Sequence, residues 1–317
     1  MNPYAIIDLH CDTLTGCGYY TKRPEVDSLN DSRRMLSLDR LPQGVHWAQF
    51  FAIFIPDELR GQDAVEFFEA NTAEFQRQTR KYAEKISPCR TWADIAGAWA
   101  GNRTAGILTV ENGSALAGKL ERIPVLAAAG VRALTITWNG ENELGSGNVT
   151  DHGLSPLGRE AIPELEQAGI LLDVSHLNDA GLDDLLKLAQ KPFLATHSNA
   201  RAVCPHKRNL NDEQIQELVR RDCLIGLNFA NCFLRAGGEH AGLDDLMRHV
   251  EHFFRLGAET NLALGSDYDG TDVPPELGTA EKVPVLLDYF LDRGLTQAQA
   301  EGILYRNAQT FFQKNLI

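Results

Sequence analysis

The sequence has few basic residues and lacks any long apolar run. Lysine and arginine total 30 against 43 aspartates and glutamates, so the formal net charge is −13. The densest basic cluster is the short His206-Lys207-Arg208. This balance argues against nucleic acid as a partner, because a phosphate-binding surface needs clustered lysine and arginine. Because no run approaches the roughly 18 to 20 apolar residues of a membrane span, no membrane partner is expected.

We expect neither an export signal nor disulfide bonds. The polar end of the first apolar run, at His10, lies only about ten residues from Met1, whereas a signal peptide needs a basic start and a longer apolar stretch. The C-terminal residues 311–317 do not form a lipid-anchor signal. Sparse cysteines without a Cys-x-x-Cys pair are typical of a reducing compartment. We therefore expect a cytoplasmic protein with mostly buried thiols; the six cysteines are Cys11, Cys17, Cys89, Cys204, Cys223 and Cys232.

Apolar, β-branched runs of strand length alternate along the chain with segments of helical periodicity. The sequence contains no internal repeat, low-complexity tract or convincing linker. Eight strands, each followed by a helical segment, predict an α/β fold: a (β/α)8 TIM barrel that takes residues 1–317 as a single domain. The predicted strands are 6–13, 47–56, 104–111, 131–138, 170–175, 193–196, 224–229 and 262–266; the helices include 63–86, 115–129, 156–167, one that Asn211 caps, and 243–256.

The first predicted strand ends in alternating polar residues. Side chains two apart on a strand share a face, so Asp8, His10 and Asp12 point the same way. An imidazole and a carboxylate in this arrangement can bind one divalent cation, with Asp8 orienting His10 from one step deeper. The alternative is a strand end that simply meets solvent.

Four further predicted strands end at or just before a histidine or a carboxylate: Glu111, His176, His197, and Asp267 with Asp269. In a barrel these ends meet at one rim, where active sites of this fold are built. Histidines and carboxylates without a thiolate suit zinc or a similar divalent ion, and two such sets indicate two ions bridged by one carboxylate. Taken singly, Glu111 could be an exposed turn acid, His176 a helix cap and His197 a rim histidine.

The same residues carry a family resemblance that runs nearly end to end. The chain resembles the zinc dipeptidases of the membrane (renal) dipeptidase family, and it looks like a soluble, bacterial-type member. Each motif is weak alone, but their order along a barrel pattern is highly specific. The matching segments are 8–12, 49–54, 111–113, 153–158, 173–176, 196–200, 207–209 and 265–270.

The resemblance implies a role for each matching residue. His10 and Asp12 would hold the first zinc, Glu111 would bridge both ions, and His176 with His197 would hold the second; Mn or Co would accept the same ligands. Asp267 matches the catalytic carboxylate, and Arg208 matches the arginine that binds the terminal carboxylate of the substrate. From spacing alone, Arg208 would be a surface base.

The implied reaction is metal-assisted hydrolysis of a dipeptide with a free C-terminal carboxylate. A water that bridges two zinc ions would become a hydroxide near neutral pH and attack the peptide carbonyl. The family also makes L,D-dipeptides candidate substrates, and it implies a homodimer. Small peptides are thus the expected partners.

One residue departs from the family pattern. Mammalian members carry a histidine after the fourth strand, where this sequence has Trp138, and an indole cannot take a proton at neutral pH. His152, later in the same loop, is a candidate substitute. Two alternatives therefore stay open. One is another binuclear amidohydrolase, acting on an N-acyl amino acid, a lactam or a phosphoester; the other is a metal-retaining pseudoenzyme that serves as a binding partner.

Overall fold

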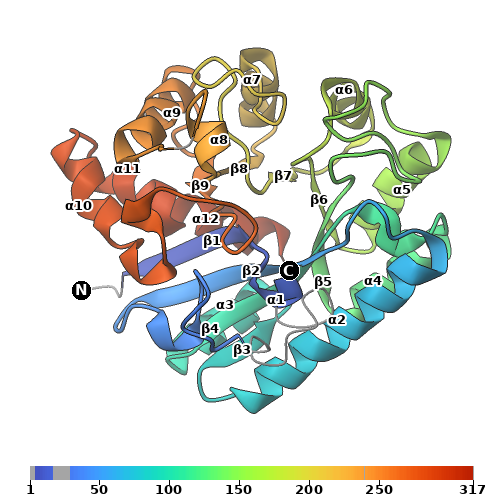
Figure 1. The fold of residues 1–317 in the computed structure, drawn as a ribbon, viewed down its shortest axis with the longest axis horizontal. Coiled ribbons are helices and arrows are strands. Elements are labelled where there is room, and N and C mark those ends of the chain that lie inside the picture. The colour runs from blue at the N-terminus through green and yellow to red at the C-terminus, as the bar shows by residue number, and fades with distance from the viewer. Residues whose placement is uncertain (1–3, 17–28, 239, 317) are drawn as a thin grey trace.

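The computed structural model describes residues 4–16, 29–238 and 240–316, and its central feature is a closed barrel of parallel strands (Figure 1). Neighbouring strands pair in order around the ring, and β2 pairs with β4 from Ala48↔Ala105 to Phe54↔Glu111 to complete it. This confirms the predicted (β/α)8 barrel. The barrel strands are β1 (Ala5–Cys11), β2 (His46–Phe54), β4 (Thr104–Glu111), β5 (Val131–Thr135), β6 (Leu171–Asp173), β7 (Leu194–Ala195), β8 (Leu224–Leu227) and β9 (Leu262–Leu264).

Helices surround the strands (Figure 1). Several helices begin at N-cap residues that can be recognised in the sequence. The side chain of Asn211 accepts from the Gln214 amide at 2.8 Å, and that of Ser155 accepts from the Gly158 amide at 2.9 Å. The α-helices are α1 (Thr13–Gly16), α2 (Gly61–Lys81), α3 (Trp92–Ala100), α4 (Ile123–Ala129), α5 (Pro156–Gln167), α6 (Asp179–Leu188), α7 (Asp212–Arg220), α8 (Asn231–Leu234), α9 (Leu243–Arg255), α10 (Val285–Asp292), α11 (Gln297–Glu301) and α12 (Asn307–Asn315).

Two predicted helices are shorter than expected. The helix predicted over 63–86 ends at Lys81, and the chain then forms the strand β3 (Ile86–Cys89) and the helix α3. β3 pairs with the first half of β4, and β5 pairs with the second half of the same strand. Because β5 continues the ring, β3 lies outside it. The helix predicted over 115–129 is α-helical only in α4, because Ala117 and Gly118 adopt left-handed φ angles of 49° and 72°.

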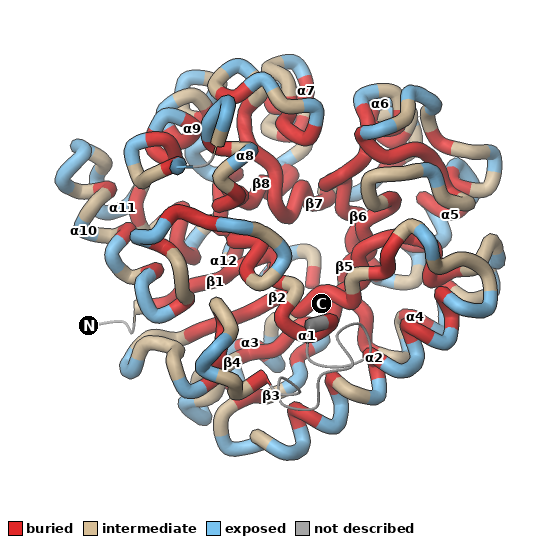
Figure 2. Tube along the Cα trace, in the orientation of Figure 1, coloured by how far each residue is buried: buried red, intermediate tan, exposed pale blue. Residues whose placement is uncertain are grey.

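Burial follows the strands, and exposed stretches lie on the outer ring of helices and loops (Figure 2). All seven residues of β1 are buried, as expected for a parallel strand that is covered on both faces. Aromatic side chains fill the layer between barrel and helices, where Phe50 of β2 stacks on Phe312 of α12 with ring centroids 5.0 Å apart. Among the thiols, Cys11, Cys89, Cys204 and Cys223 are buried and Cys232 is exposed, while Cys17 lies outside the described residues.

Close backbone contacts shape the barrel near the carboxyl ends of β7, β8 and β9. A Cβ atom on Gly226 would lie 1.9 Å from the carbonyl oxygen of Thr196, and one on Gly265 would lie 1.8 Å from the same atom. Only glycine permits this approach. Nearby, the buried Asp8 carboxylate joins the first and last strands by accepting from the Ser266 amide at 2.8 Å and its hydroxyl at 2.6 Å.

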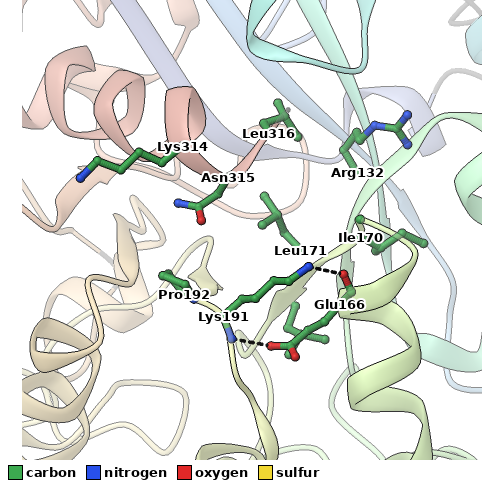
Figure 3. A pocket seen from close by; sticks show the side chains of 11 residues that line it. Arg132, Glu166, Ile170, Leu171, Lys191, Pro192, Lys314, Asn315 and Leu316 are labelled. Atoms are coloured by element: carbon green, nitrogen blue, oxygen red, sulfur yellow. Dashed lines mark hydrogen bonds between the residues drawn. The ribbon is translucent and has the colours of Figure 1, made fainter.

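A cavity of about 190 Å³ lies at the opposite, amino-terminal end of the strands (Figure 3). Its wall includes Arg132 and Leu171, which stand near the starts of β5 and β6. Lys191 donates from its side chain to the Glu166 carbonyl at 2.7 Å, so this cation is already paired within the fold. That end of a barrel serves stability rather than chemistry. In the described part of the chain, no helix is both long and apolar enough to cross a bilayer.

The glycine contacts predict opposite effects for two alanine substitutions. Gly226→Ala should lower the free energy of unfolding by about 1–3 kcal/mol or more, because the methyl group collides with backbone. Gly97→Ala should raise it by about 0.5–1 kcal/mol, because Gly97 lies within α3 with open space around its Cβ position. Thermal unfolding midpoints measure both. Equal midpoints for the two variants would contradict the close approach of β8 to Thr196.

Candidate metal centre

The carboxyl ends of the strands bring the predicted site residues together. Glu111 ends β4, His10 lies one residue before the end of β1, and His176, His197 and Asp267 follow β6, β7 and β9 within three residues. A cavity of about 370 Å³ opens above them, and its lining includes Asp12, Glu111, His176 and Asp267.

His10 and three carboxylates form one half of the site. The Nε2 atom of His10 lies 3.6 Å from Asp12 Oδ2, 3.6 Å from Glu111 Oε2 and 4.0 Å from Asp267 Oδ1. Backbone bonds set this arrangement, because the Asp12 amide donates to Tyr268 and the Asp267 amide donates to His10. His10 Nε2 is buried, and no described residue gives it a hydrogen bond. The Asp8 contact with His10 is to its backbone amide, at 3.4 Å.

Two histidines and the other oxygen of Glu111 form the second half. Glu111 Oε1 lies 2.7 Å from His176 Nε2 and 3.7 Å from His197 Nε2, and the two Nε2 atoms lie 3.0 Å apart. Glu111 therefore stands between the two halves, with one oxygen toward each. All three side chains are buried.

The Nδ1 atoms of His176 and His197, on the side of each ring away from Glu111, both have a polar partner. His176 Nδ1 lies 3.0 Å from Asn139 Oδ1, which also accepts from Asn148 at 2.6 Å, so Nδ1 must carry the proton. His197 Nδ1 lies 2.8 Å from the Thr196 hydroxyl. The Nε2 atom of a neutral His176 ring then presents a lone pair toward His197 and Glu111. Two imidazole nitrogens and a carboxylate oxygen thus converge in a buried space, and this donor set fits a divalent metal.

The pKa shifts of the site residues reflect an excess of carboxylates over positive charge in the cluster. Burial lowers the pKa of His10, but Glu111, Asp12 and Asp267 outweigh it and raise the value to about 10. Burial raises the pKa of Glu111 and of Asp267, since neither is balanced by enough positive charge. The pKa values of His176 and His197 lie well below the ordinary range, first because of burial.

The backbone at the rim is strained where side chains must turn inward. His176 and Asp267 adopt left-handed φ angles of 72° and 62°, which few residues other than glycine take. Gly270 then passes so close that a Cβ there would lie 2.0 Å from Asp12 Oδ2 and 2.7 Å from Asp267 Oδ1. Asp269, also left-handed at 65°, accepts from the Met35 amide at 2.8 Å and anchors that loop.

Arg208 is buried beside the cluster, although spacing alone marks it as a surface base. Its side chain donates to the His197 carbonyl at 3.4 Å and lies 5.4 Å from the centre of the Phe233 ring. Across the described chain, no carboxylate is within ion-pair distance of it, and its Nε atom lacks a hydrogen-bond partner. A buried guanidinium left in this state is costly, so it is suited to receive an anion.

Trp138 and His152 have different surroundings. Trp138 lines the cavity, with its ring edge-on to Phe54 at 4.8 Å and 6.3 Å from the ring of His176. The side chain of His152 is 85% exposed and is paired with Glu141 at 2.5 Å. The structure therefore does not bring His152 into the cluster, and nothing in its placement supports a role as substitute for the missing histidine.

Sequence reasoning missed Asn228, whose side-chain amide donates to Asp267 Oδ2 at 2.9 Å. Its position just beyond β8 is the available signal, because β8 would otherwise send no polar side chain to the rim. Phe233, in the short helix α8, was likewise not expected to line the cavity.

Comparisons with known proteins agree with this geometry. A model of the family described as membrane dipeptidase (peptidase family M19) matches residues 1–315. The chain belongs to this family.

Among relatives, an uncharacterized protein in the pqqA 5′ region of Klebsiella pneumoniae is 33% identical over 236 residues, covering 71% of this chain and 87% of that protein. The chain is 26% identical to a Rhodobacter sphaeroides metallo peptidase solved with a phosphinate mimic of L-Ala-D-Ala, with a TM-score of 0.92 and coverage of 99% and 100%. It is 27% identical to dipeptidase AC, a metallo peptidase, with a TM-score of 0.93 and coverage of 99% of each chain. The family and these neighbours support a metal-dependent dipeptidase, a hydrolase of the metallopeptidase class.

The pKa of His10 predicts how the metal-free protein responds to pH. The folded value of about 10 exceeds the ordinary 6.5, so the stability that protonated His10 contributes is complete below pH 6.5 and is lost as the pH rises toward 10. The raised pKa values of Glu111 and Asp267 act in the same direction. In chelator, the unfolding midpoint should therefore fall between about pH 7 and about pH 9.

His10→Gln is the control, because other groups also titrate in this window. The variant should lose less thermal stability over the same range than the unsubstituted chain. Identical slopes would mean that His10 does not carry the raised pKa.

Proposed function

We propose that this protein is a binuclear zinc dipeptidase that hydrolyses dipeptides with a free C-terminal carboxylate. The observation that carries the proposal is the buried group of His176 and His197 around Glu111, where two imidazole nitrogens 3.0 Å apart face a carboxylate oxygen. Family membership supports the same reaction class.

The two halves of the cluster divide the ligands between two ions. His10 and Asp12 with one oxygen of Glu111 would hold the first ion, and the other oxygen with His176 and His197 would hold the second. Imidazole and carboxylate donors without thiolate suit zinc and would also take Mn or Co. When bound, such a metal pair supplies Lewis acidity and makes a water molecule acidic near neutral pH.

Asp267 is the group placed to move protons. Asn228 holds its Oδ2 atom at 2.9 Å and leaves Oδ1 toward the His10 half of the site. Because burial raises its pKa, Asp267 can accept a proton from the attacking water and return it to the leaving amine. We assign it as the general base and then the general acid.

Arg208 supplies the specificity for a short substrate. Its buried, unpaired guanidinium matches the geometry of a carboxylate, which an internal peptide bond of a protein does not offer. The Rhodobacter neighbour binds a mimic of L-Ala-D-Ala, so we extend the proposal to L,D-dipeptides. Trp138, Phe54 and Phe233 would form the apolar part of the substrate wall.

Replacing Arg208 with methionine should raise KM for a dipeptide by about 10–100-fold, with a smaller loss of kcat. The reason is the loss of a hydrogen-bonded charge pair, which is worth about 1.5–3 kcal/mol. Steady-state kinetics on a dipeptide and on its C-terminal amide measure the effect. The unsubstituted enzyme should discriminate against the amide, and the variant should not.

Lys207→Met is the matched control, because this neighbouring side chain is 72% exposed. It should leave KM within about twofold of the original value, since a solvated charge contributes little. If Arg208→Met retains the preference for the free acid, Arg208 does not bind the terminal carboxylate.

Replacing Asp267 with asparagine should lower kcat by about 10²–10⁴-fold, because the amide cannot shuttle a proton. Asparagine keeps the acceptor for Asn228 and tolerates the left-handed φ of 62°, so the variant should retain its metal. Metal content by mass spectrometry and turnover on a panel of L,L- and L,D-dipeptides measure both properties.

The same panel tests the function as a whole. Chelator should abolish dipeptide hydrolysis and added zinc should restore it, while N-acyl amino acids and lactams should be poor substrates. Activity confined to those latter compounds, or activity that survives complete metal removal, would refute the proposed dipeptidase.

A further inference from the structure

The His197 ring is supported in an indirect way. A metal-binding histidine commonly donates its second N–H to a carboxylate or a backbone carbonyl. Here a hydroxyl stands between ring and carboxylate: His197 Nδ1 lies 2.8 Å from Thr196 Oγ1, which donates to Asp173 Oδ2 at 2.7 Å. The three side chains are at most 2% exposed, so water cannot easily take the place of either bond.

The proton count fixes the direction of both bonds. Asp173 accepts from two hydroxyls, Thr135 at 2.6 Å and Thr196 at 2.7 Å, and from the backbone amides of Ser175 at 3.1 Å and Thr196 at 2.9 Å. With four donors around it, the carboxyl group acts only as an acceptor. The single hydroxyl proton of Thr196 is therefore directed to Asp173, and its oxygen is left to accept the proton on His197 Nδ1.

We propose that Asp173 and Thr196 are positioning residues that hold His197 in the Nδ1–H form and so present its Nε2 lone pair to the second metal position. This inference rests on the metal centre of the proposed function. The chemistry requires both residues, because a threonine without the carboxylate could turn its own proton toward Nδ1 and leave the proton of His197 on the wrong nitrogen.

The support comes from the rigid part of the fold. Asp173 is the last residue of β6, Thr135 is the last of β5, and Thr196 directly follows β7, so three neighbouring strands meet at one carboxylate. The backbone of Thr196 is further confined by Gly226 and Gly265, which press against its carbonyl oxygen.

His176 is held differently. Its Nδ1 atom is paired with the neutral side chain of Asn139, which belongs to the loop after β5 and lines the cavity. The two histidines of the second metal position thus differ in kind, one fixed through an anion on three strands and the other through an amide on a substrate-facing loop. We therefore expect the Asp173–Thr196 pair to set metal affinity more than substrate selectivity.

The decisive substitution is Thr196→Val, which removes the hydroxyl and keeps the shape. Loss of such an outer partner lowers metal affinity by about 10–100-fold. The experiment uses the full chain, stripped and reloaded with zinc or cobalt, and measures the dissociation constant of each ion by chelator competition. Thr196→Val should first lose the ion at the second metal position. The visible spectrum of the cobalt-loaded variant should also change.

Thr135→Val is the matched control, because it removes a hydroxyl from the same Asp173 oxygen without touching a histidine. This variant should bind both ions within about threefold of the unsubstituted chain, and Thr196→Ser should recover most of the lost affinity. Equal affinities for Thr196→Val and Thr135→Val, with both folded, would overturn the positioning role. A general loss of packing would affect the two variants alike.

A measurement on the unsubstituted chain keeps the inference testable if Thr196→Val does not fold. Nitrogen-15 NMR of histidine-labelled, zinc-loaded protein should show His197 with a proton on Nδ1 and the metal on Nε2. A proton on Nε2 of His197 would refute the inference, and the metal content of the same sample shows separately whether the metal centre of the proposed function is present. If the unsubstituted chain binds no metal at all, the proposed function fails, and the role of Asp173 and Thr196 fails with it.

Discussion

Two imidazole nitrogens face each other across 3.0 Å in a buried pocket, with a carboxylate oxygen 2.7 Å from one of them. Nitrogen lone pairs and carboxylate charge gathered in a protein interior are unfavourable unless positive charge is supplied. The other half of the site repeats the problem, since His10 is held among three acids whose own ionisation is disfavoured by burial. Both problems have the same physical solution, which is the positive charge of a bound divalent metal beside Glu111.

The barrel makes this arrangement possible because its strands are covered on both sides and all end at one rim. Beyond the last paired residue of a strand, the sheet no longer determines the direction of the side chains. At His176 and Asp267 a left-handed φ angle directs the side chain toward the barrel axis, and at Gly270 the absence of a side chain leaves room for the neighbouring carboxylates. The strain is thus local to residues that are proposed to carry the chemistry, while hydrogen bonds that Asp8 and Asp269 accept from neighbouring segments hold the surroundings in place.

Features of this protein that depend on local sequence patterns could be predicted, whereas features that depend on contacts with distant residues could not. Strand ends could be predicted, because apolar runs stop abruptly before His10, Glu111 and His197, and topology alone then gathers them. Strand β3 was missed because Ile86 continues the apolar spacing of α2, and its pairing with β4 depends on residues nearly twenty positions away. The outward placement of His152 was equally hidden, since it depends on Asn178, which holds the carbonyls of Thr150 and His152 at 2.7 Å.

The glycine contacts around Thr196 have a consequence for how such a protein can diversify. Contacts between backbone atoms fix the position of Thr196, and with it the position of His197, at the rim of the barrel. Side-chain substitutions elsewhere do not change this position. Most of the aromatic wall, in contrast, is carried by Trp138 and Phe233 on segments outside the strands, with Phe54 at the end of β2. In the proposed dipeptidase, ligand spacing and substrate choice therefore reside largely in separable layers, and new selectivities can be explored on the loops while the spacing of the metal ligands is inherited unchanged.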